Sequence, residues 1–270
     1  MKNSTSSLNT FARCAKLWEF TYCDKLEPVD GDDSFPAAYG RAYHSLKEGD
    51  PDWAGNFGQK WQDIIEAHHD CHEMFYEARP EWADLQVVAE EVKFSFEILP
   101  GKVLHGIVDG VVEWNGKKYL IEYKTTGQQL VDWFEYKENA IQAGLYVLAA
   151  KHAPELQKFG QIEGLIYDVT RRCTLKQAKR TDQQYVKACS EWWYKNRHTS
   201  FERRVKTFDS EYLSELDYDI ITMFEAQENK LFFRNREACY AFRQKCGWYD
   251  VCFNGERKTN TDLFQIRKRR

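Results

Sequence analysis

Residues 106–124 read GIVDGVVEWNGKKYLIEYK, and this stretch decides the fold. Two runs rich in β-branched and aromatic residues flank Asn115 and Gly116, the dipeptide most typical of a two-residue type I′ turn. The pattern therefore predicts a β-hairpin. With Asn115 and Gly116 as the loop, counting back along both strands places Asp109 directly opposite Glu122.

Two opposed carboxylates, with roughly 5 Å between their β-carbons, repel each other unless a partner compensates their charge. A divalent cation is the obvious partner. Because side chains alternate along a strand, Lys124 shares the face of Glu122. Asp109, Glu122 and Lys124 thus outline a phosphate-cleaving site. A three-residue loop with a bulge would instead shift the register by one and turn Asp109 away.

The simplest alternative is that Glu-Tyr-Lys in a strand forms a solvated ion-pair face. Apolar neighbours such as Val108, Leu120 and Ile121 argue against it, because they predict strands that are buried on at least one side. Charges at that depth must be paired or bound to a metal ion.

Length and composition bound the class of protein. The chain has 270 residues, of which 43% are hydrophobic, enough for the core of one large domain. No signal peptide and no apolar run of roughly 18 residues is present, so we expect a cytoplasmic protein without a membrane partner. A net charge of -4 gives no overall attraction to nucleic acid, so DNA binding must rest on metal ions or local basic clusters. Candidate clusters are Arg171-Arg172 with Lys176, Lys179 and Arg180, Arg203-Arg204 with Lys206, and Arg267–Arg270.

The remaining pattern predicts an α/β protein. We expect helices at 7–23, 36–48, 57–77, 133–152, 181–195 and 210–228, and further strands at 86–98 and 161–169. Helices before and after a short sheet indicate a central mixed β-sheet flanked by helices on both faces.

Three further side chains could join the carboxylates. Gln142 and Tyr146 lie one turn apart on the helix after the hairpin, where an amide and a phenol could orient water or a DNA phosphate. His44 lies on an earlier helix, with Gly40 one turn before it to allow close approach, and its imidazole could supply a metal ligand.

The eight cysteines suggest a second metal centre, because a cytoplasmic chain rarely forms disulfides. Cys239, Cys246 and Cys252 cluster near the end of the chain, and Cys14 on the first helix could complete a four-cysteine site. The close cysteine pairs typical of zinc sites are missing, which favours an iron–sulfur cluster over zinc. Cys23 is a rival fourth ligand; otherwise Cys23, Cys71, Cys173 and Cys189 are expected to be buried as small hydrophobic residues.

His68 and His72 offer an alternative function. They are one helical turn apart, as in many zinc sites, which keeps a zinc-dependent hydrolase open. No catalytic Glu lies between them in the required frame, and the segment reads as an exposed amphipathic helix.

These residues resemble the RecB-like exonuclease branch of the PD-(D/E)XK nuclease superfamily, including its members with an iron–sulfur cluster. The resemblance covers nearly the whole chain and implies one nuclease domain over 1–270 with a restriction-endonuclease-like core. It matches the family's early histidine to His44, its metal-binding aspartate to Asp109, its acidic-x-Lys motif to Glu122 and Lys124, and its Gln-x-x-x-Tyr motif to Gln142 and Tyr146.

The resemblance extends to the cysteines. Members with a cluster use one cysteine near the amino terminus and three near the carboxyl terminus, similar to Cys14, Cys239, Cys246 and Cys252, and a [4Fe-4S] cluster would join the two ends of the chain. The family commonly has two residues between the first two late cysteines, whereas this chain has six between Cys239 and Cys246. The five-residue gap before Cys252 agrees with the family.

The resemblance implies a metal-dependent DNA exonuclease in recombination, repair or phage DNA processing. Asp109, Glu122 and the Ile121 carbonyl, with His44, would hold one or two Mg²⁺ or Mn²⁺ ions, and Lys124 would position or deprotonate the water. No ATP-binding Gly-x-x-x-x-Gly-Lys-Ser/Thr motif occurs, so the enzyme would act on free ends alone or with a separate helicase or recombination protein. The alternatives are a catalytically silent DNA-binding module of the same fold and a sequence-specific endonuclease.

Overall fold

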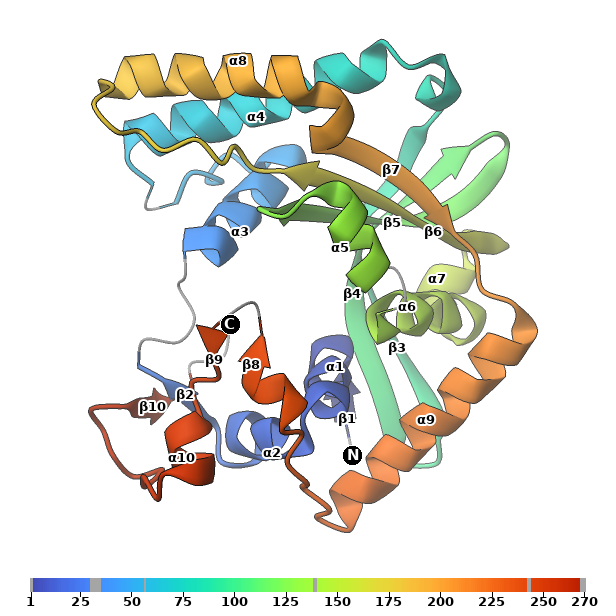
Figure 1. Ribbon diagram of the computed structural model, residues 1–270. Helices are drawn as coiled ribbons and strands as arrows, with labels where there is room; N and C mark the ends of the chain where they lie inside the picture. Colours follow the sequence, from blue (N-terminus) through green and yellow to red (C-terminus); the bar gives the residue numbers. More distant parts are fainter. Residues whose placement is uncertain (1, 30–34, 56, 138–139, 242–243, 268–270) are drawn as a thin grey trace. The chain divides into compact units, whose positions relative to one another are not determined.

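The computed structural model describes residues 2–29, 35–55, 57–137, 140–241 and 244–267 (Figure 1). The chain divides into two compact units. The terminal unit comprises Met1–Ser34, Ser95–Gly106 and Ser210–Arg270, and the central unit comprises Phe35–Phe94 and Ile107–Asp209. The expectation of a single domain stays a prediction.

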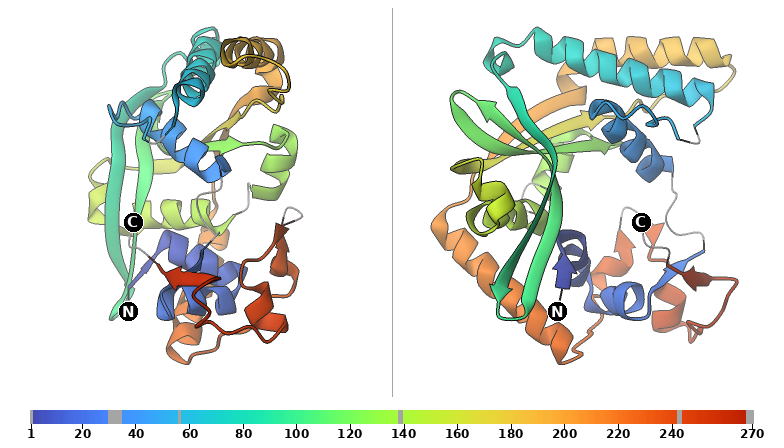
Figure 2. Two further views of the ribbon diagram at one scale, coloured as in Figure 1. Left: turned by 90° about the vertical axis from the view of Figure 1, so that its left-hand side faces the viewer. Right: turned by 180° about the vertical axis from the view of Figure 1, so that it is seen from behind.

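The described strands include one mixed sheet of six. Its order is β1-β4-β5-β6-β7, with β3 paired to β4, and Figure 2 shows β3 and β4 running side by side. Pairing is parallel for β1–β4 and β5–β6, and antiparallel for β4–β5 and β6–β7. The strands are β1 (Lys2–Ser4), β3 (Gln86–Leu99), β4 (Lys102–Trp114), β5 (Lys117–Thr126), β6 (Ile162–Arg171) and β7 (Phe201–Lys206).

The predicted hairpin between β4 and β5 is confirmed. Its ladder runs from Gly110 opposite Ile121 to Trp114 opposite Lys117, the register expected from a two-residue loop. Asn115 and Gly116 have φ values of 52° and 69°, and a type I′ turn requires positive φ at both positions.

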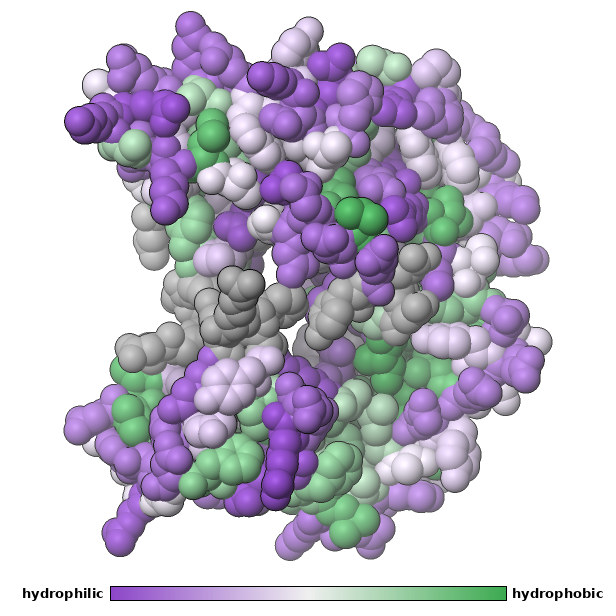
Figure 3. All heavy atoms as spheres, in the orientation of Figure 1, coloured by the Kyte–Doolittle hydropathy of each residue, from purple (hydrophilic) through white to green (hydrophobic). Residues whose placement is uncertain are grey.

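Helices cover both faces of the sheet in the central unit, as predicted. Figure 1 shows α3, α4 and α8 on one side of β5, β6 and β7, and α5 and α6 on the other. On the face shown in Figure 3, hydrophilic side chains predominate over α4 and α8. The helices are α3 (Phe35–Lys47), α4 (Gln59–Glu77), α5 (Leu130–Lys137), α6 (Ile141–His152), α7 (Pro154–Gln157) and α8 (Asp182–Ser200).

An aromatic core fills the space between α3, α4, α8 and the sheet. Its buried members come from all four elements: Tyr39, Tyr43, Ile64, Ile65, Phe75, Trp193 and Phe201. The ring of His68 stacks on Trp193, with centroids 4.3 Å apart and planes 7° from parallel. This packing fixes α3 and α4, and therefore the side chains that they point at the sheet.

The terminal unit joins the two ends of the chain. Phe11 and Trp18 pack against Met223 and Phe232, and Trp248 stacks on Phe264 with centroids 4.5 Å apart. Its described elements beyond β1 are α1 (Thr5–Arg13), α2 (Ala15–Trp18), η1 (Glu19–Cys23), β2 (Leu26–Pro28), α9 (Ser210–Glu228), η3 (Glu237–Cys239), β8 (Tyr240–Ala241), β9 (Gln244–Lys245), α10 (Tyr249–Phe253) and β10 (Phe264–Ile266).

Three predictions of secondary structure need correction. The helix expected at 7–23 breaks at Cys14, whose backbone is extended (φ -164°, ψ 112°), and ends in the π-helical turn η1. The helix expected at 133–152 is two helices, because Ala140 is extended as the N-cap of α6. The basic segment at 203–206 was not predicted as a strand, yet it lies in β7. Within the described ranges, no helix is both long and apolar enough to cross a bilayer.

Candidate active site

Asp109 lies where the β4–β5 ladder ends. Gly110 opposite Ile121 is the last paired position, and beyond it Asp109 replaces the next main-chain bond with its side chain. Its Oδ2 accepts the Tyr123 main-chain N–H at 2.8 Å. Tyr123 therefore holds the Asp109 carboxylate beside β5, next to Glu122. The negative charge of Asp109 raises the pKa of Glu122.

Glu122 and Lys124 form a buried ion pair on β5. Glu122 is 1% exposed, and its Oε1 lies against the Lys124 ammonium. The other oxygen, Oε2, is buried and has no hydrogen-bond partner among the described residues. Burial raises the pKa of Glu122 to about 7 although Lys124 favours the charged form, and Asp109 adds to the rise. The two carboxylates outweigh burial and raise the pKa of Lys124.

His44 on α3 reaches the same carboxylate. Its Nε2 is 2.9 Å from Asp109 Oδ2, and its Nδ1 is 2.8 Å from Glu48 Oε1. Burial alone would lower the pKa of His44, but the bond to Asp109 and the two acidic charges raise it. The glycine predicted to allow this approach does so, because a Cβ on Gly40 would lie 3.1 Å from Thr125 Oγ1 of β5.

A second glycine lets the strands close around Asp109. A Cβ on Gly110 would lie 2.8 Å from the Ala89 carbonyl oxygen of β3 and 3.1 Å from Ile121 Cγ2. Any larger residue would push β3 away from β4 next to the carboxylate.

Gln142 and Tyr146 contact each other on α6. Gln142 Nε2 donates to the Tyr146 hydroxyl at 2.8 Å, and the Tyr146 ring packs edge-on against Phe94. Their approach to the carboxylates stays a prediction.

The donor groups suit a hard divalent cation, although the ligand set is looser than expected. Within the described residues, no three His, Cys, Asp or Glu side chains converge closely enough to hold a metal ion. We expected His44, Asp109 and Glu122 to converge on one metal position, and they do not. His44 instead contacts Asp109, and Lys124 forms an ion pair with Glu122. Glu122 Oε2 nevertheless is buried and has no hydrogen-bond partner among the described residues, and a bound cation would compensate the cost of burying it.

His68 and His72 do not form the exposed pair that was expected. Both are buried, at 0% and 1% exposed. His68 bonds Tyr39 and Thr170, and His72 bonds Glu73 and Asp168, so all four ring nitrogens have protein partners. This arrangement argues against a zinc hydrolase built on these histidines.

The sequence interpretation missed a buried charge cluster at Asp168. Its Oδ1 lies 2.7 Å from His72 Nε2, and its Oδ2 accepts from Arg203 Nε at 3.0 Å. Burial would raise the pKa of Asp168, but Arg203 and His72 hold it well below its ordinary value. Asp168 faces Arg203 across β6 and β7, so recognising β7 would have revealed the pair.

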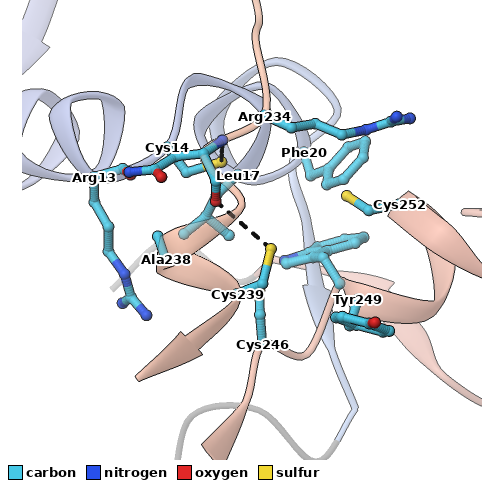
Figure 4. A pocket seen from close by; sticks show the side chains of 12 residues that line it. Arg13, Cys14, Leu17, Phe20, Arg234, Ala238, Cys239, Cys246, Tyr249 and Cys252 are labelled. Atoms are coloured by element: carbon cyan, nitrogen blue, oxygen red, sulfur yellow. Dashed lines mark hydrogen bonds between the residues drawn. The ribbon is translucent and has the colours of Figure 1, made fainter. Parts of the chain in front are cut away.

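The four predicted cluster cysteines line one pocket of the terminal unit (Figure 4). The pocket is small, about 20 Å³, and Asn235 contacts two of its thiols: Cys14 accepts from its N–H at 3.4 Å, and Cys239 donates to its carbonyl at 3.6 Å. Burial and the neighbouring thiols raise the pKa of Cys239 and Cys252. Cys23 is exposed rather than buried and does not line the pocket.

The comparison with known families gives the class of protein, a nuclease, in agreement with the mixed sheet flanked by helices. The family model described as the PD-(D/E)XK nuclease superfamily matches residues 2–253, and the chain belongs to this superfamily. Such nucleases typically use Mg²⁺ or Mn²⁺. No curated protein matches the chain. Among solved structures, the crystal structure of SSO0001 is 12% identical over 82% of this chain and 76% of that chain, with a TM-score of 0.33.

Proposed function

We propose that this nuclease is a Mg²⁺- or Mn²⁺-dependent DNA exonuclease of the RecB-like branch. The observation that carries the proposal is the buried Glu122 carboxylate, which has one oxygen against Lys124 and the other unpartnered, beside a second carboxylate held by His44. Burying these charges costs folding free energy, and such groups are typically kept where they take part in function. A metal-assisted reaction on phosphate is a function that needs them.

Asp109, Glu122 and the Ile121 carbonyl would hold the metal ion, with His44 as a ligand or as the group that orients Asp109. A bound divalent cation supplies an acidic water and stabilises negative charge on the phosphate. Lys124, whose pKa is raised, would keep its proton and donate hydrogen bonds from its ammonium group to the water or to phosphate oxygens, which positions the water and offsets negative charge. Gln142 and Tyr146 would orient the water or the DNA backbone.

We further propose that Cys14, Cys239, Cys246 and Cys252 bind a [4Fe-4S] cluster. Four thiol donors around one pocket suit iron–sulfur chemistry. Burial raises the pKa of Cys239 and Cys252, and this cost is relieved when a metal binds their thiolates. Because the pocket is small, a single zinc ion is the alternative occupant that the test must distinguish from the cluster. Metal analysis and a visible spectrum of anaerobically purified protein distinguish the two metals. The family resemblance leads us to expect the broad absorption near 400 nm of an iron–sulfur cluster, which zinc does not give.

The process would be recombination, repair or phage DNA processing. The sequence has no ATP-binding motif of the Gly-x-x-x-x-Gly-Lys-Ser/Thr type, so the enzyme would act on free ends alone or on ends delivered by a separate helicase or recombination protein.

The test is digestion of end-labelled linear DNA and of closed circular DNA with Mg²⁺, Mn²⁺ or EDTA. We expect metal-dependent loss of the linear substrate and an intact circle. Cutting of the circle would support an endonuclease instead. Binding of DNA without cleavage of either substrate, by protein with its cysteine site loaded, would identify a catalytically silent module.

A further inference from the structure

A pocket of about 200 Å³ opens in the central unit where α3 and α4 meet the segment after β6. Its lining includes four aromatic side chains, Phe35, Tyr39, Trp61 and Tyr185, together with Arg172. Pockets for drug-sized ligands usually measure roughly 300–1,000 Å³. This one is better suited to a single planar ring system.

The aromatic residues divide into a floor and a rim. Tyr39 and Tyr185 are buried, and the Tyr39 hydroxyl bonds His68. Phe35 is 39% exposed and Trp61 is partly exposed, with ring centroids 4.4 Å apart. The rim therefore presents aromatic surface to solvent, which is the surface on which nucleic-acid bases stack.

Arg172 supplies a positive charge for which the described part of the chain holds no counterion. Its Nε is buried and has no hydrogen-bond partner, and no carboxylate of the described ranges forms an ion pair with it. Its guanidinium lies 5.6 Å from the centre of the Tyr39 ring. Gly127 leaves room for it, because a Cβ there would lie 3.1 Å from Arg172 Nη2. Arg172 as a whole is half-buried and lines the pocket, so its guanidinium is placed to bind an anionic acceptor, and a phosphate would provide one.

The pocket lies at the carboxyl end of the strand pair that carries Glu122. The Arg172 main-chain N–H donates to the Thr126 carbonyl at 2.7 Å, and Thr126 pairs with Arg171 across the parallel β5 and β6. Glu122 precedes Thr126 by four residues, roughly 13 Å along the strand. Glu122 pairs with Tyr167, which contacts Trp133 of α5, so the Glu122 side chain and the pocket lie on opposite faces of the sheet. Ligands of open α/β sheets bind beyond the carboxyl ends of the strands, and a DNA strand that crosses this end would reach both.

We propose that the pocket binds one unstacked base of a single-stranded DNA substrate, a few nucleotides from the bond that is cut. The base stacks on Trp61 and Phe35, and Arg172 binds the adjoining phosphate. The inference rests on the proposed nuclease function and adds that the substrate is single-stranded where it crosses this site.

A measurement on the unaltered protein tests the base pocket directly. Oligo(dT) with 2-aminopurine at one position, moved stepwise along the strand, is bound in EDTA so that nothing is cut. We expect one position, at a fixed distance from the end, to lose fluorescence through stacking while distant positions stay as in free DNA. Equal fluorescence at every position would overturn the proposal.

Variants test the same contacts. Trp61→Ala and Arg172→Gln should each weaken binding of oligo(dT) in EDTA by roughly 5-fold to 100-fold, whereas Trp61→Phe should keep most of the affinity. Tyr194→Ala and Arg197→Gln are matched controls, since both residues lie on α8 beside a different pocket. Affinities of Trp61→Ala and Arg172→Gln equal to those of the controls would refute the assignment.

The outcomes separate this inference from the nuclease proposal. If no metal supports cleavage but the local quenching and the variant effects hold, the nuclease proposal fails and the base pocket stands. If DNA is cut and the variants bind like wild type, only the base pocket fails. Tight binding of dTMP by a pocket whose variants leave oligo(dT) affinity unchanged would assign a free nucleotide instead and also refute it.

Discussion

The Nε2 of His44 lies 2.9 Å from Oδ2 of Asp109, the oxygen that also accepts the Tyr123 main-chain N–H. One carboxylate oxygen thus ties α3 to the end of the β4–β5 ladder, next to Glu122. Among the described residues, Oε2 of Glu122 has no hydrogen-bond partner, so this buried oxygen is left to act on a ligand.

Glu122→Gln and Lys124→Ala should each abolish metal-dependent DNA cleavage. Glu122→Gln keeps the shape of the side chain but leaves the Lys124 ammonium without its counterion. Because the Lys124 side chain is 37% exposed and the Asp109 charge also acts on it, the variant should still fold, with a modest loss of stability. Cleavage rates are read beside thermal unfolding curves. Lys118→Ala, on the same strand but bonded to the Phe159 carbonyl, serves as the control and should cleave normally. Wild-type rates in either catalytic variant would remove that residue from the reaction.

His44→Ala should weaken the apparent affinity for Mg²⁺ by roughly 10-fold to 100-fold, because Asp109 loses the group that orients it. His44→Gln can still donate to Asp109 and should recover part of the loss. Titration of activity with Mg²⁺ separates this effect from a change in maximal rate. An unchanged metal dependence in His44→Ala would show that the contact has no part in metal binding.

Asp168→Asn should lower the free energy of unfolding by about 3–5 kcal/mol, because it leaves the buried Arg203 guanidinium without its counterion. Arg203→Met alone should cost a similar amount. The double variant should be less destabilised than the sum of the two single variants, and denaturant unfolding of all four proteins measures the coupling. Additive losses would contradict a direct ion pair.

Acid should reduce the advantage of wild type over Asp168→Asn. The pKa of Asp168 is depressed in the folded protein, so its contribution is fully present above the unfolded value near 3.9 and declines as the pH falls below it. The difference in unfolding free energy should shrink by up to about 1.4 kcal/mol per pH unit in that range. Unfolding curves at pH 7, 4 and 3 test this. A constant difference across the series would mean that folding does not lower the pKa of Asp168.

Local chemistry explains which parts of the fold could be predicted. Asn115 and Gly116 determine a turn whose register follows from loop length alone, so the hairpin and the placement of Glu122 beside Lys124 needed no tertiary information. His68 and His72 were misread because helical spacing does not say which face is buried, and here α4 is covered by both α3 and α8.

Other features depend on partners far apart in the chain. Asp168 lies in an apolar strand where nothing local marks a charge pair, and Arg203 meets it only through the β6–β7 ladder. The break at Cys14 was likewise hidden, because the helical pattern continues through it while its thiol contacts Asn235, distant in sequence.

Cys14→Ser should reduce the metal content of the purified protein to background and make the terminal unit susceptible to proteolysis. Cys14 lines the pocket from the amino-terminal segment, whereas Cys239, Cys246 and Cys252 come from the other end of the chain. A metal centre there would stabilise the packing of the two ends, since binding free energy at such sites adds to folding free energy. Cys23→Ser is the matched control, because Cys23 is exposed and outside the pocket, and it should retain the metal. If Cys14→Ser retains as much iron or zinc as this control, the four-cysteine centre is wrong.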